Sequence, residues 1–393
     1  MKVLSIGTDR KLFEEESDVL SRTLEYAKLF DELHVIVFTT KKFKIRNLRF
    51  KNGDRKMAIS DNCWIYPTCS RNRWFYVFDA IALGVQILSH KSEITNQENG
   101  FVVSCQDPFE CGLAGARIAK KTGAKLHVQI HTDFLSPYFK KGGFLNMVRL
   151  FLAGRVLPKA DAIRVVSKRI ADSLVFKYKN IKVSKLSILP MFLDEGKIKN
   201  APVTADLHKK YPKFTFIVLV LSRFTKEKNI LLAIDAFSRV VLKHPRAGLV
   251  IVGSGPQMSF LKAQVARSNL SQNVVFEGWT SDPYSYIKSS DLVLQTSWYE
   301  GYGLAVAESL LCGIPVVSTS VGVATELLMD NAYSFVCEPG DAKCLSEKMT
   351  AFMEKRTLFG FVVENARRKL QGGLPTKEEY LRKYKNSVFS VFS

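Results

Sequence analysis

The feature that most constrains the fold is an alternation between short apolar runs and longer amphipathic runs, and it occurs twice along the chain. In the second half it begins with Phe216–Leu221, a continuous apolar run of the kind expected in a strand buried on both faces. The amphipathic segment Asn229–Leu242 follows it. Strands that alternate with helices of ten or more residues predict βαβ units and a parallel sheet. The chain is therefore predicted to have an α/β fold with two doubly wound sheets.

The same reasoning predicts where the chain divides. A length of 393 residues allows two or three domains. The polar stretch Asp194–Lys213 interrupts the alternation and is predicted to be a linker. We therefore expect one Rossmann-like domain over residues 1–195 and a second over 196–355. Residues 356–393 are predicted to form one or two basic amphipathic helices.

Charge is distributed unevenly and indicates an anionic partner. The formal net charge is +20, and residues 1–200 carry 34 Lys and Arg against 20 Asp and Glu. Such a basic half fits nucleic acid, a phosphorylated substrate or an anionic membrane face, with solubility alone as the alternative. Because the chain has no known nucleic-acid-binding module, we expect no nucleic acid partner.

Cysteine usage and hydropathy indicate an intracellular protein. The seven cysteines include no Cys-x-x-Cys pair and no partner histidines at zinc spacing, so reduced thiols and no metal site are expected. No apolar stretch approaches the roughly 20 residues of a membrane-spanning helix, and the first residues do not resemble a signal peptide. A cytoplasmic location is the resulting expectation.

Two loops after predicted strands could hold a phosphorylated ligand. Arg223 and Lys228 lie where Phe216–Leu221 turns into a helix, which would place two cations beside a helix N-terminus and suit a diphosphate. Gly253 and Gly255 follow the next strand, where a tight turn allows close approach to a ligand. Solvated charges and a plain turn are the alternatives. The chain has neither a Gly-x-Gly-x-x-Gly fingerprint nor a P-loop, which argues against a dehydrogenase or an NTPase.

Further candidates follow the later strands. Gly278 and Trp279 could hold a nucleobase through main-chain hydrogen bonds, although Trp279 could equally pack between domains. Glu300 precedes a glycine-rich loop that opens a helix, and Glu308 falls two turns into that helix. Main-chain N–H groups of the loop could bind a phosphate, and an ionised Glu308 could accept hydrogen bonds from a ribose diol. The loop and helix start comprise Gly301, Tyr302, Gly303 and Leu304.

These residues together resemble a known family. Glu300-x7-Glu308, followed by Gly313-Ile314-Pro315-Val316-Val317 and Gly322-Val323-Ala324-Thr325-Glu326, is similar to the donor site of family 4 of the retaining glycosyltransferases. Arg223, Lys228 and the Gly253 turn match the same pattern, which is specific over residues 214–345 and diffuse before them. The resemblance implies the GT-B fold, with two Rossmann-like domains facing a central cleft and a C-terminal helix that crosses back to the first domain.

The resemblance also implies a reaction. A retaining hexosyltransferase moves a sugar from a nucleotide-diphospho-sugar to a hydroxyl of a glycan or lipid-linked acceptor, here in polysaccharide or glycolipid synthesis. The N-terminal domain would bind the acceptor and the C-terminal domain the donor. Arg223 and Lys228 would stabilise the leaving diphosphate, Glu300 would orient the sugar, and His131 in Gln129–Asp133 would meet it. No Asp-x-Asp motif occurs, so no cofactor and no obligatory metal are expected.

Two departures from the family pattern are visible. The first strand runs into Gly7-Thr8-Asp9-Arg10 with one glycine rather than a glycine-rich loop, which leaves its contacts undefined. Asn229 stands where relatives often have glycine after the lysine, and asparagine tolerates the left-handed conformation. A nucleotide-sugar epimerase, or a binding protein without transfer, is the alternative on the same scaffold.

The N-terminal half also suggests a membrane surface. Phe134–Ala160 contains no Asp or Glu and interleaves basic with apolar residues, the composition of an interfacial helix. Lys41–Lys56 carries eight basic residues and one acid. Both segments predict peripheral docking on an anionic cytoplasmic leaflet. The alternative is that the apolar face of 143–157 packs inside the domain.

Overall fold

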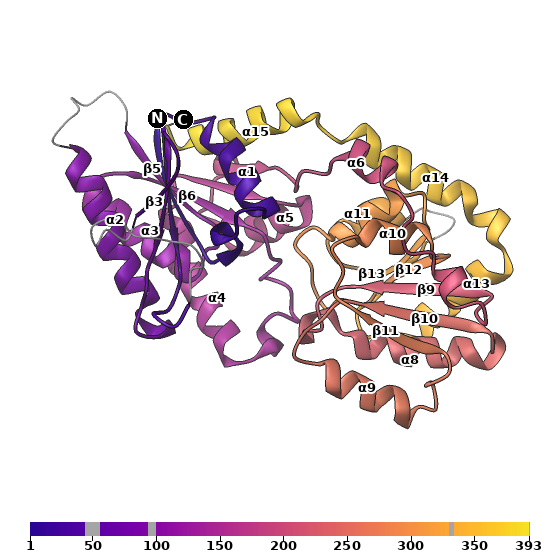
Figure 1. Ribbon diagram of the computed structural model, residues 1–393. Helices are drawn as coiled ribbons and strands as arrows, with labels where there is room; N and C mark the ends of the chain where they lie inside the picture. The colour runs from indigo at the N-terminus through magenta and orange to yellow at the C-terminus, as the bar shows by residue number, and fades with distance from the viewer. Residues whose placement is uncertain (44–55, 93–99, 330–333, 393) are drawn as a thin grey trace. The chain divides into compact units, whose positions relative to one another are not determined.

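The computed structural model describes residues 1–43, 56–92, 100–329 and 334–392 (Figure 1). The chain forms two compact units, each built around one sheet. Unit 1 contains Met1–Leu135, Gly143–Pro190 and Lys377–Ser393, and unit 2 contains Ser136–Gly142 and Met191–Thr376.

Unit 1 alternates strands and helices as its sequence predicts. Its strands are β1 (Lys2–Gly7), β2 (Glu32–Val37), β3 (Met57–Ser60), β4 (Cys63–Pro67), β5 (Phe101–Cys105), β6 (Lys125–Ile130), β7 (Ala162–Val165) and β8 (Leu186–Ile188). Its helices are α1 (Asp18–Ala27), α2 (Tyr76–Ser92), α3 (Glu110–Thr122), α4 (Phe144–Val156), α5 (Lys168–Lys177) and α15 (Lys377–Phe389).

The sheet of unit 1 has the order β3-β4-β2-β1-β5-β6-β7-β8. All its pairings are parallel except that of β3 with β4. Interior strands such as β2 and β7 are almost wholly buried and rich in β-branched residues, as parallel strands covered on both faces should be.

Unit 2 repeats the pattern with a smaller sheet. Its strands are β9 (Phe216–Leu221), β10 (Ala247–Val252), β11 (Val274–Gly278), β12 (Leu292–Gln295), β13 (Val316–Thr319) and β14 (Val336–Cys337). Its helices are α6 (Glu195–Asn200), α7 (Leu207–Lys210), α8 (Ile230–Lys243), α9 (Met258–Arg267), α10 (Pro283–Lys288), α11 (Leu304–Leu311), α12 (Ala324–Leu328), α13 (Ala342–Glu354) and α14 (Arg356–Gly372).

The strands of unit 2 are parallel and follow the order β11-β10-β9-β12-β13-β14. Helix α8 packs against α13 and α9, whereas α11 and α12 pack against α14. This is the doubly wound arrangement, in which the order reverses between β9 and β12. Loops that follow these two strands therefore meet at the reversal, and the candidate site lies there.

Two boundaries differ from those expected. The stretch predicted as a linker carries α6 and α7, whose first turns are capped by the side chains of Asp194 and Asp206, and both helices belong to unit 2. The predicted tail is also divided. Helix α14 packs on α11 and α12 within unit 2, and only the chain from Lys377 onward belongs to unit 1. Apolar residues of α14, including Val362, Ala366 and Leu370, are buried, which explains why it stays with unit 2.

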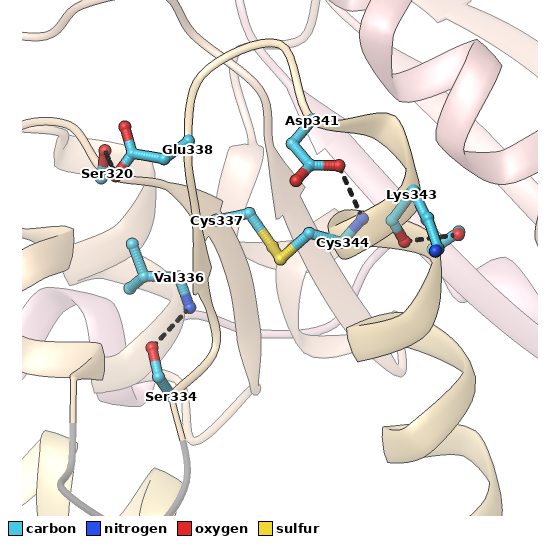
Figure 2. Close-up of a disulfide and its surroundings, with 9 residues drawn as sticks. Ser320, Ser334, Val336, Cys337, Glu338, Asp341, Lys343 and Cys344 are labelled. Carbon is cyan, nitrogen blue, oxygen red and sulfur yellow. Dashed lines mark hydrogen bonds between the residues drawn. A yellow bond between two sulfur atoms is a disulfide. The ribbon is translucent and has the colours of Figure 1, made fainter.

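One expectation about the cysteines is wrong. Cys337 at the end of β14 and Cys344 in the first turn of α13 form a disulfide, with their Cα atoms 5.9 Å apart (Figure 2). The Asp341 side chain accepts a hydrogen bond from the Cys344 N–H at 2.9 Å and so caps α13. The tight turn between strand and helix brings the two Cα atoms within the range that a disulfide spans. The other five cysteines are free.

Among the residues that the structure describes, no helix is both long and apolar enough to cross a bilayer.

Candidate active site

The site is built at the carboxyl ends of β9 and β12, which pair at the reversal of strand order. Open α/β sheets bind ligands at such a point because neighbouring loops there turn to opposite faces of the sheet. The loop after β9 carries Arg223 and Lys228, and the loop after β12 carries Glu300. The fold therefore brings together two motifs that lie 72 positions apart in the sequence.

The centre of the site is an ion pair between Lys228 and Glu300. The Lys228 Nζ donates a hydrogen bond to Glu300 Oε1 at 2.6 Å, and the Ser297 hydroxyl donates to the same oxygen at 2.7 Å. The side chains of Lys228 and Glu300 are only 17% and 14% exposed, so water screens the pair poorly. The carboxylate is thus held in place before any ligand arrives.

Main-chain contacts join the two loops. Asn229 adopts the left-handed conformation with φ 47°, which confirms that asparagine can replace the usual glycine here. The Thr296 hydroxyl lies 3.1 Å from the Lys228 carbonyl and 3.0 Å from the Asn229 carbonyl and can donate to either. The Trp298 N–H donates to the Glu227 carbonyl at 2.8 Å. A shift of one loop therefore moves the other.

The glycine-rich loop leads directly into α11. Gly303 has φ 93° and occupies the position before the first helical residue, Leu304, where main-chain N–H groups lack helical acceptors. The turn at Gly322 packs against this loop, because a Cβ there would lie 2.2 Å from the Tyr302 carbonyl oxygen. The Val323 N–H donates to that same carbonyl at 2.7 Å. Gly301, Tyr302 and Gly303 are buried, so the loop has a defined path.

Glu308 lies one turn further along α11 and is half-buried. Burial raises its pKa to about 7, while the Tyr284 hydroxyl, 3.5 Å from Oε1, acts in the opposite direction. Both protonation states are therefore populated near neutral pH. An ionised Glu308 can accept two hydrogen bonds from vicinal hydroxyls, as the sequence pattern predicts.

The loops after β9, β10 and β11 also contact one another. A Cβ at Gly253, which has φ 138°, would lie 1.9 Å from the Ser222 carbonyl oxygen. The Gly253 N–H donates to the Gly278 carbonyl at 2.6 Å. Gly255 has φ 157° and approaches the main chain of Phe224. Glycine is thus required at 253 and 255 by the close approach of the β9 loop.

Two predicted residues lie nearer the solvent. The Arg223 side chain is 74% exposed, and its Nη2 lies 3.4 Å from Glu227 Oε1. Trp279 is 67% exposed, beside Gly278 with φ 77°. Both side chains are therefore accessible to a ligand.

His131 belongs to unit 1, whereas the other predicted site residues belong to unit 2. It follows β6 and is half-buried, with its Nε2 3.2 Å from Gln106 Oε1. Burial, reinforced by the positive charges of Arg164 and Arg22, lowers the pKa of His131 to about 3. The imidazole is therefore neutral at physiological pH, so one ring nitrogen donates a hydrogen bond and the other accepts one.

Sequence reasoning missed three supporting residues. Ser297 and Thr296 orient Glu300 and the Lys228 turn, and their position at the end of β12 was a usable signal. Tyr284 comes from α10 and meets Glu308 only in the folded unit, so nothing in the linear pattern pointed to it.

The comparison with protein families supplies the deciding observation. Residues 205–369 match the model of the family Glycosyl transferases group 1. The matched region is less than half of the chain and contains every predicted site residue except His131.

Curated relatives of the chain have names that refer to a sugar-containing product or to sugar transfer. The chain is 27% identical over 271 residues to "Alpha-monoglucosyldiacylglycerol synthase" of Streptococcus pneumoniae, covering 66% of this chain and 60% of that protein. It is 25% identical over 298 residues to "N-acetyl-alpha-D-glucosaminyl L-malate synthase" of Bacillus anthracis, covering 75% and 76%. It is 29% identical over 220 residues to a Campylobacter jejuni N-acetylgalactosaminyltransferase named for a diphospho-undecaprenol substrate, covering 56% and 58%. These names confirm the predicted enzyme class.

Solved structures confirm the fold. Anabaena Alr3699/HepE in complex with UDP and glucose superposes with a TM-score of 0.74 at 19% identity, covering 99% of this chain and all of that one. Sucrose-phosphate synthase from Thermosynechococcus elongatus gives 0.76 at 17% identity, covering 100% and 99%. The chain therefore has the GT-B fold, as the resemblance implied. The aligned region is less than two thirds of the Streptococcus protein and 21% of a Bacillus subtilis "Poly(glycerol-phosphate) alpha-glucosyltransferase".

Proposed function

We propose that the protein is a retaining glycosyltransferase of family 4 that moves a sugar from a nucleotide-diphospho-sugar to a hydroxyl of a lipid-linked or glycan acceptor. The observation that carries this proposal is the Lys228–Glu300 ion pair at the head of α11, 2.6 Å long and mostly buried. It places a cation, a carboxylate and a helix N-terminus at one ligand-binding edge.

In this reaction the leaving nucleoside diphosphate gains negative charge. Lys228, Arg223 and the main-chain N–H groups of Gly301–Leu304 would stabilise that charge. Each charge-assisted hydrogen bond contributes roughly 1.5–3 kcal/mol, and about 1.4 kcal/mol changes a rate tenfold. Because Ser297 and Lys228 already hold Glu300, little reorganisation is needed when the donor reacts.

Of the remaining site residues, some would contact the nucleotide of the donor and others its sugar. Glu308 would accept hydrogen bonds from the ribose, the turns at Gly253, Gly255 and Gly278 would let the main chain approach the nucleotide, and Trp279 would cover the base. Glu300 would orient sugar hydroxyls. His131, whose imidazole is neutral, would contact the transferred sugar.

We also propose that turnover requires no metal ion. The leaving phosphate takes the acceptor proton on the face where the new bond forms, so no separate protein base is involved. Lys228 and Arg223 would balance the negative charge of the leaving nucleoside diphosphate in place of a metal ion. Activity in the presence of EDTA should match that without it, and loss of activity that Mg²⁺ or Mn²⁺ restores would contradict this part of the proposal.

A thermal-shift panel followed by turnover assays tests the donor. UDP, GDP, ADP and their sugar conjugates are compared, because a ligand at 100 times its Kd stabilises the fold by about 2.7 kcal/mol. Lys228→Ala and Glu308→Ala should each weaken donor binding or turnover by about tenfold or more, from the loss of one charge-assisted contact. Lys262→Ala, an exposed lysine on α9, is the control. Unchanged kinetics in both site variants would refute the donor site.

An epimerase or a binding protein without transfer remains the alternative function. The donor incubated without an acceptor distinguishes them, since an epimerase would convert the sugar and a binding protein would leave it intact even after an acceptor is added. The transferase requires both substrates and retains the configuration of the transferred sugar, which NMR of the product reports.

The acceptor part of the proposal rests on helix α4. Ala153 and Val156 of α4 are buried, but Phe144 is 76% exposed and Phe151 is 59% exposed. Other apolar residues of the helix are also exposed: Leu145, Met147 and Val148. The alternative interpretation is that the apolar face of residues 143–157 packs inside the domain. The exposures show that this holds for only one side of α4. The other predicted basic cluster, Lys41–Lys56, lies largely outside the described residues.

Basic residues lie just before α4 in the sequence and within it. Lys140, Lys141 and Arg155 are exposed. Arg149 instead pairs with Glu110 at 3.1 Å and so has a role inside unit 1. We propose that α4 docks on an anionic cytoplasmic leaflet and brings the enzyme to a lipid-linked acceptor. The names of the Streptococcus and Campylobacter relatives, which refer to a diacylglycerol and a diphospho-undecaprenol, support a lipid acceptor.

Liposome co-sedimentation tests this docking. Each Lys or Arg near an anionic surface contributes about 1 kcal/mol, so Glu at positions 140, 141 and 155 should reduce binding to anionic vesicles by at least about tenfold. Glu at Lys243, Lys262 and Arg267 gives the same charge change on α8 and α9 and should have little effect. Binding should fall as salt shortens the Debye length. Equal binding of both triple variants, or none by the wild type, would favour a soluble acceptor.

A further inference from the structure

One segment of the N-terminal half packs with the donor domain. Ser136–Gly142 lies in the sequence between His131 and α4, yet it belongs to unit 2, while the chain on both sides of it belongs to unit 1. The segment folds on itself, because the Phe139 N–H donates to the Ser136 carbonyl and the Gly142 N–H to the Phe139 carbonyl, both at 3.0 Å. It therefore forms a compact turn rather than an extended connection.

Two aromatic contacts attach this turn to the loop after β12. The Tyr138 ring stacks on Trp298 with centroids 4.8 Å apart, and the Phe139 ring meets Tyr299 edge to face at 5.4 Å. Phe139 is 4% exposed. Aromatic pairs of this kind hold their partners in a defined orientation beyond what buried area alone provides.

The partners of these contacts are the two residues that precede Glu300. Trp298 is also fixed on its other sides: its N–H donates to the Glu227 carbonyl, and a Cβ at Gly340 would lie 3.1 Å from its ring. The Tyr138 hydroxyl lies 3.4 Å from the carbonyl of the neighbouring Pro339. Trp298 is thus enclosed by the loop after β9, by the loop after β14 and by Tyr138. Glu300 follows it two positions later in the sequence.

We propose that Tyr138 and Phe139 are positioning residues that hold the Trp298–Glu300 loop, so that a segment of the N-terminal half determines where the donor-site carboxylate lies. The kinetic part of this inference rests on the proposed transferase function, whereas the packing part does not. A loop freed of these contacts would let Glu300 leave Lys228 and Ser297 without removing any group that touches the nucleotide.

Hydrogen exchange detects the packing independently of catalysis. In Tyr138→Ala and Phe139→Ala, amides of the peptide spanning residues 297–303 should exchange at least about fivefold faster than in the wild type. Phe144→Ala removes an exposed aromatic ring a few residues away and should leave this peptide unchanged. Tyr138→Phe keeps the ring and loses only the long hydroxyl contact, so it should restore most of the protection. Wild-type exchange in Tyr138→Ala and in Phe139→Ala would overturn the proposal.

Steady-state kinetics separates positioning from general destabilisation. Tyr138→Ala should lower kcat about tenfold while changing the Kd for the free nucleotide diphosphate less than about twofold, because Glu308 and the α11 N-terminus remain in place. Equal losses in kcat and nucleotide affinity would indicate a merely structural role and overturn the inference. Absence of transfer in the wild type would refute the proposed function, and the exchange measurement would then still decide whether Tyr138 and Phe139 hold the loop.

Discussion

At the scale of single residues, the site depends on where each charge is buried. Lys228 and Glu300 are both mostly buried and paired, so removing either one would leave the other as an uncompensated buried charge. Glu308 lies in a half-buried position with a tyrosine hydroxyl at the limit of hydrogen-bond distance, and its pKa rises to about 7. Glu308 can therefore change its protonation state near neutral pH.

Glu308 should make donor affinity depend on pH. If the ionised carboxylate binds the ribose, nucleotide Kd should be about tenfold weaker at pH 6 than at pH 8, the change expected for titration near pH 7. Calorimetry across this range measures it. Glu308→Gln should show a flat profile, and Tyr284→Phe, which removes the hydrogen bond that lowers the pKa, should move the midpoint upward. A wild-type profile as flat as that of the Gln variant would contradict the role.

The same shift affects stability with a defined sign. The pKa of Glu308 in the folded protein is raised above its ordinary value of 4.5. Its favourable contribution to folding stability is therefore complete below pH 4.5 and is lost as the pH rises toward 7. The melting temperature of Glu308→Gln, relative to that of the wild type, should therefore rise as the pH increases from 4.5 to 7.5. A difference in melting temperature that stays constant with pH would show that burial does not raise the pKa of Glu308.

At the scale of elements, the glycine-rich loop and α11 work together. Gly303 has φ 93°, which costs a residue with a Cβ roughly 1–2 kcal/mol. We expect Gly303→Ala to shift the first turn of α11 and to weaken nucleotide binding about tenfold, measured by calorimetry. Gly360→Ala on α14 is the control, because a Cβ there meets nothing within 4 Å, and it should be neutral or slightly stabilising. Equal affinity in Gly303→Ala would mean that the loop geometry is not used.

The β14–α13 connection is a second element with a measurable contribution. A disulfide that closes so short a loop stabilises by about 2 kcal/mol in the chain-entropy model. Reducing agent should therefore lower the melting temperature of the wild type, and a variant with serine at both Cys337 and Cys344 should be insensitive to it. If the wild type melts identically with and without reductant, the bridge contributes nothing.

At the scale of the whole molecule, the chain leaves unit 1 near Pro190 and returns to it at Lys377. The buried side chain of Arg164 contacts the chain both where it leaves unit 1 and where it returns. Its Nη2 is within 3.1 Å of the Leu189 carbonyl and 3.0 Å of the Tyr380 hydroxyl, and its guanidinium lies over the Tyr384 ring. Tyr384 in turn stacks on Tyr26 of α1. Helix α15 is thus part of the core of unit 1.

Removing this helix should therefore destabilise unit 1. Truncation after Thr376 leaves Arg164 buried without the hydroxyl and ring of α15, and Tyr384→Ala alone should cost about 3–5 kcal/mol. Phe389→Ala, a partly exposed residue of the same helix, should cost less than about 1 kcal/mol. Denaturant unfolding followed by exchange of unit 1 peptides measures both. A truncated protein with native protection in unit 1 would show that α15 is dispensable.

The linear pattern of apolar and polar residues by itself determined the parallel sheets and the segments that carry Lys228, Glu300 and Glu308, because strand and helix periods and glycine turns are local properties. The tertiary structure alone decided which distant groups meet. It placed Tyr284 beside Glu308, joined Cys337 to Cys344, kept α14 in unit 2 and set Tyr138 on Trp298. Burial, pKa and packing partners depend on contacts between segments that are far apart in the chain, and no periodicity within one segment encodes them.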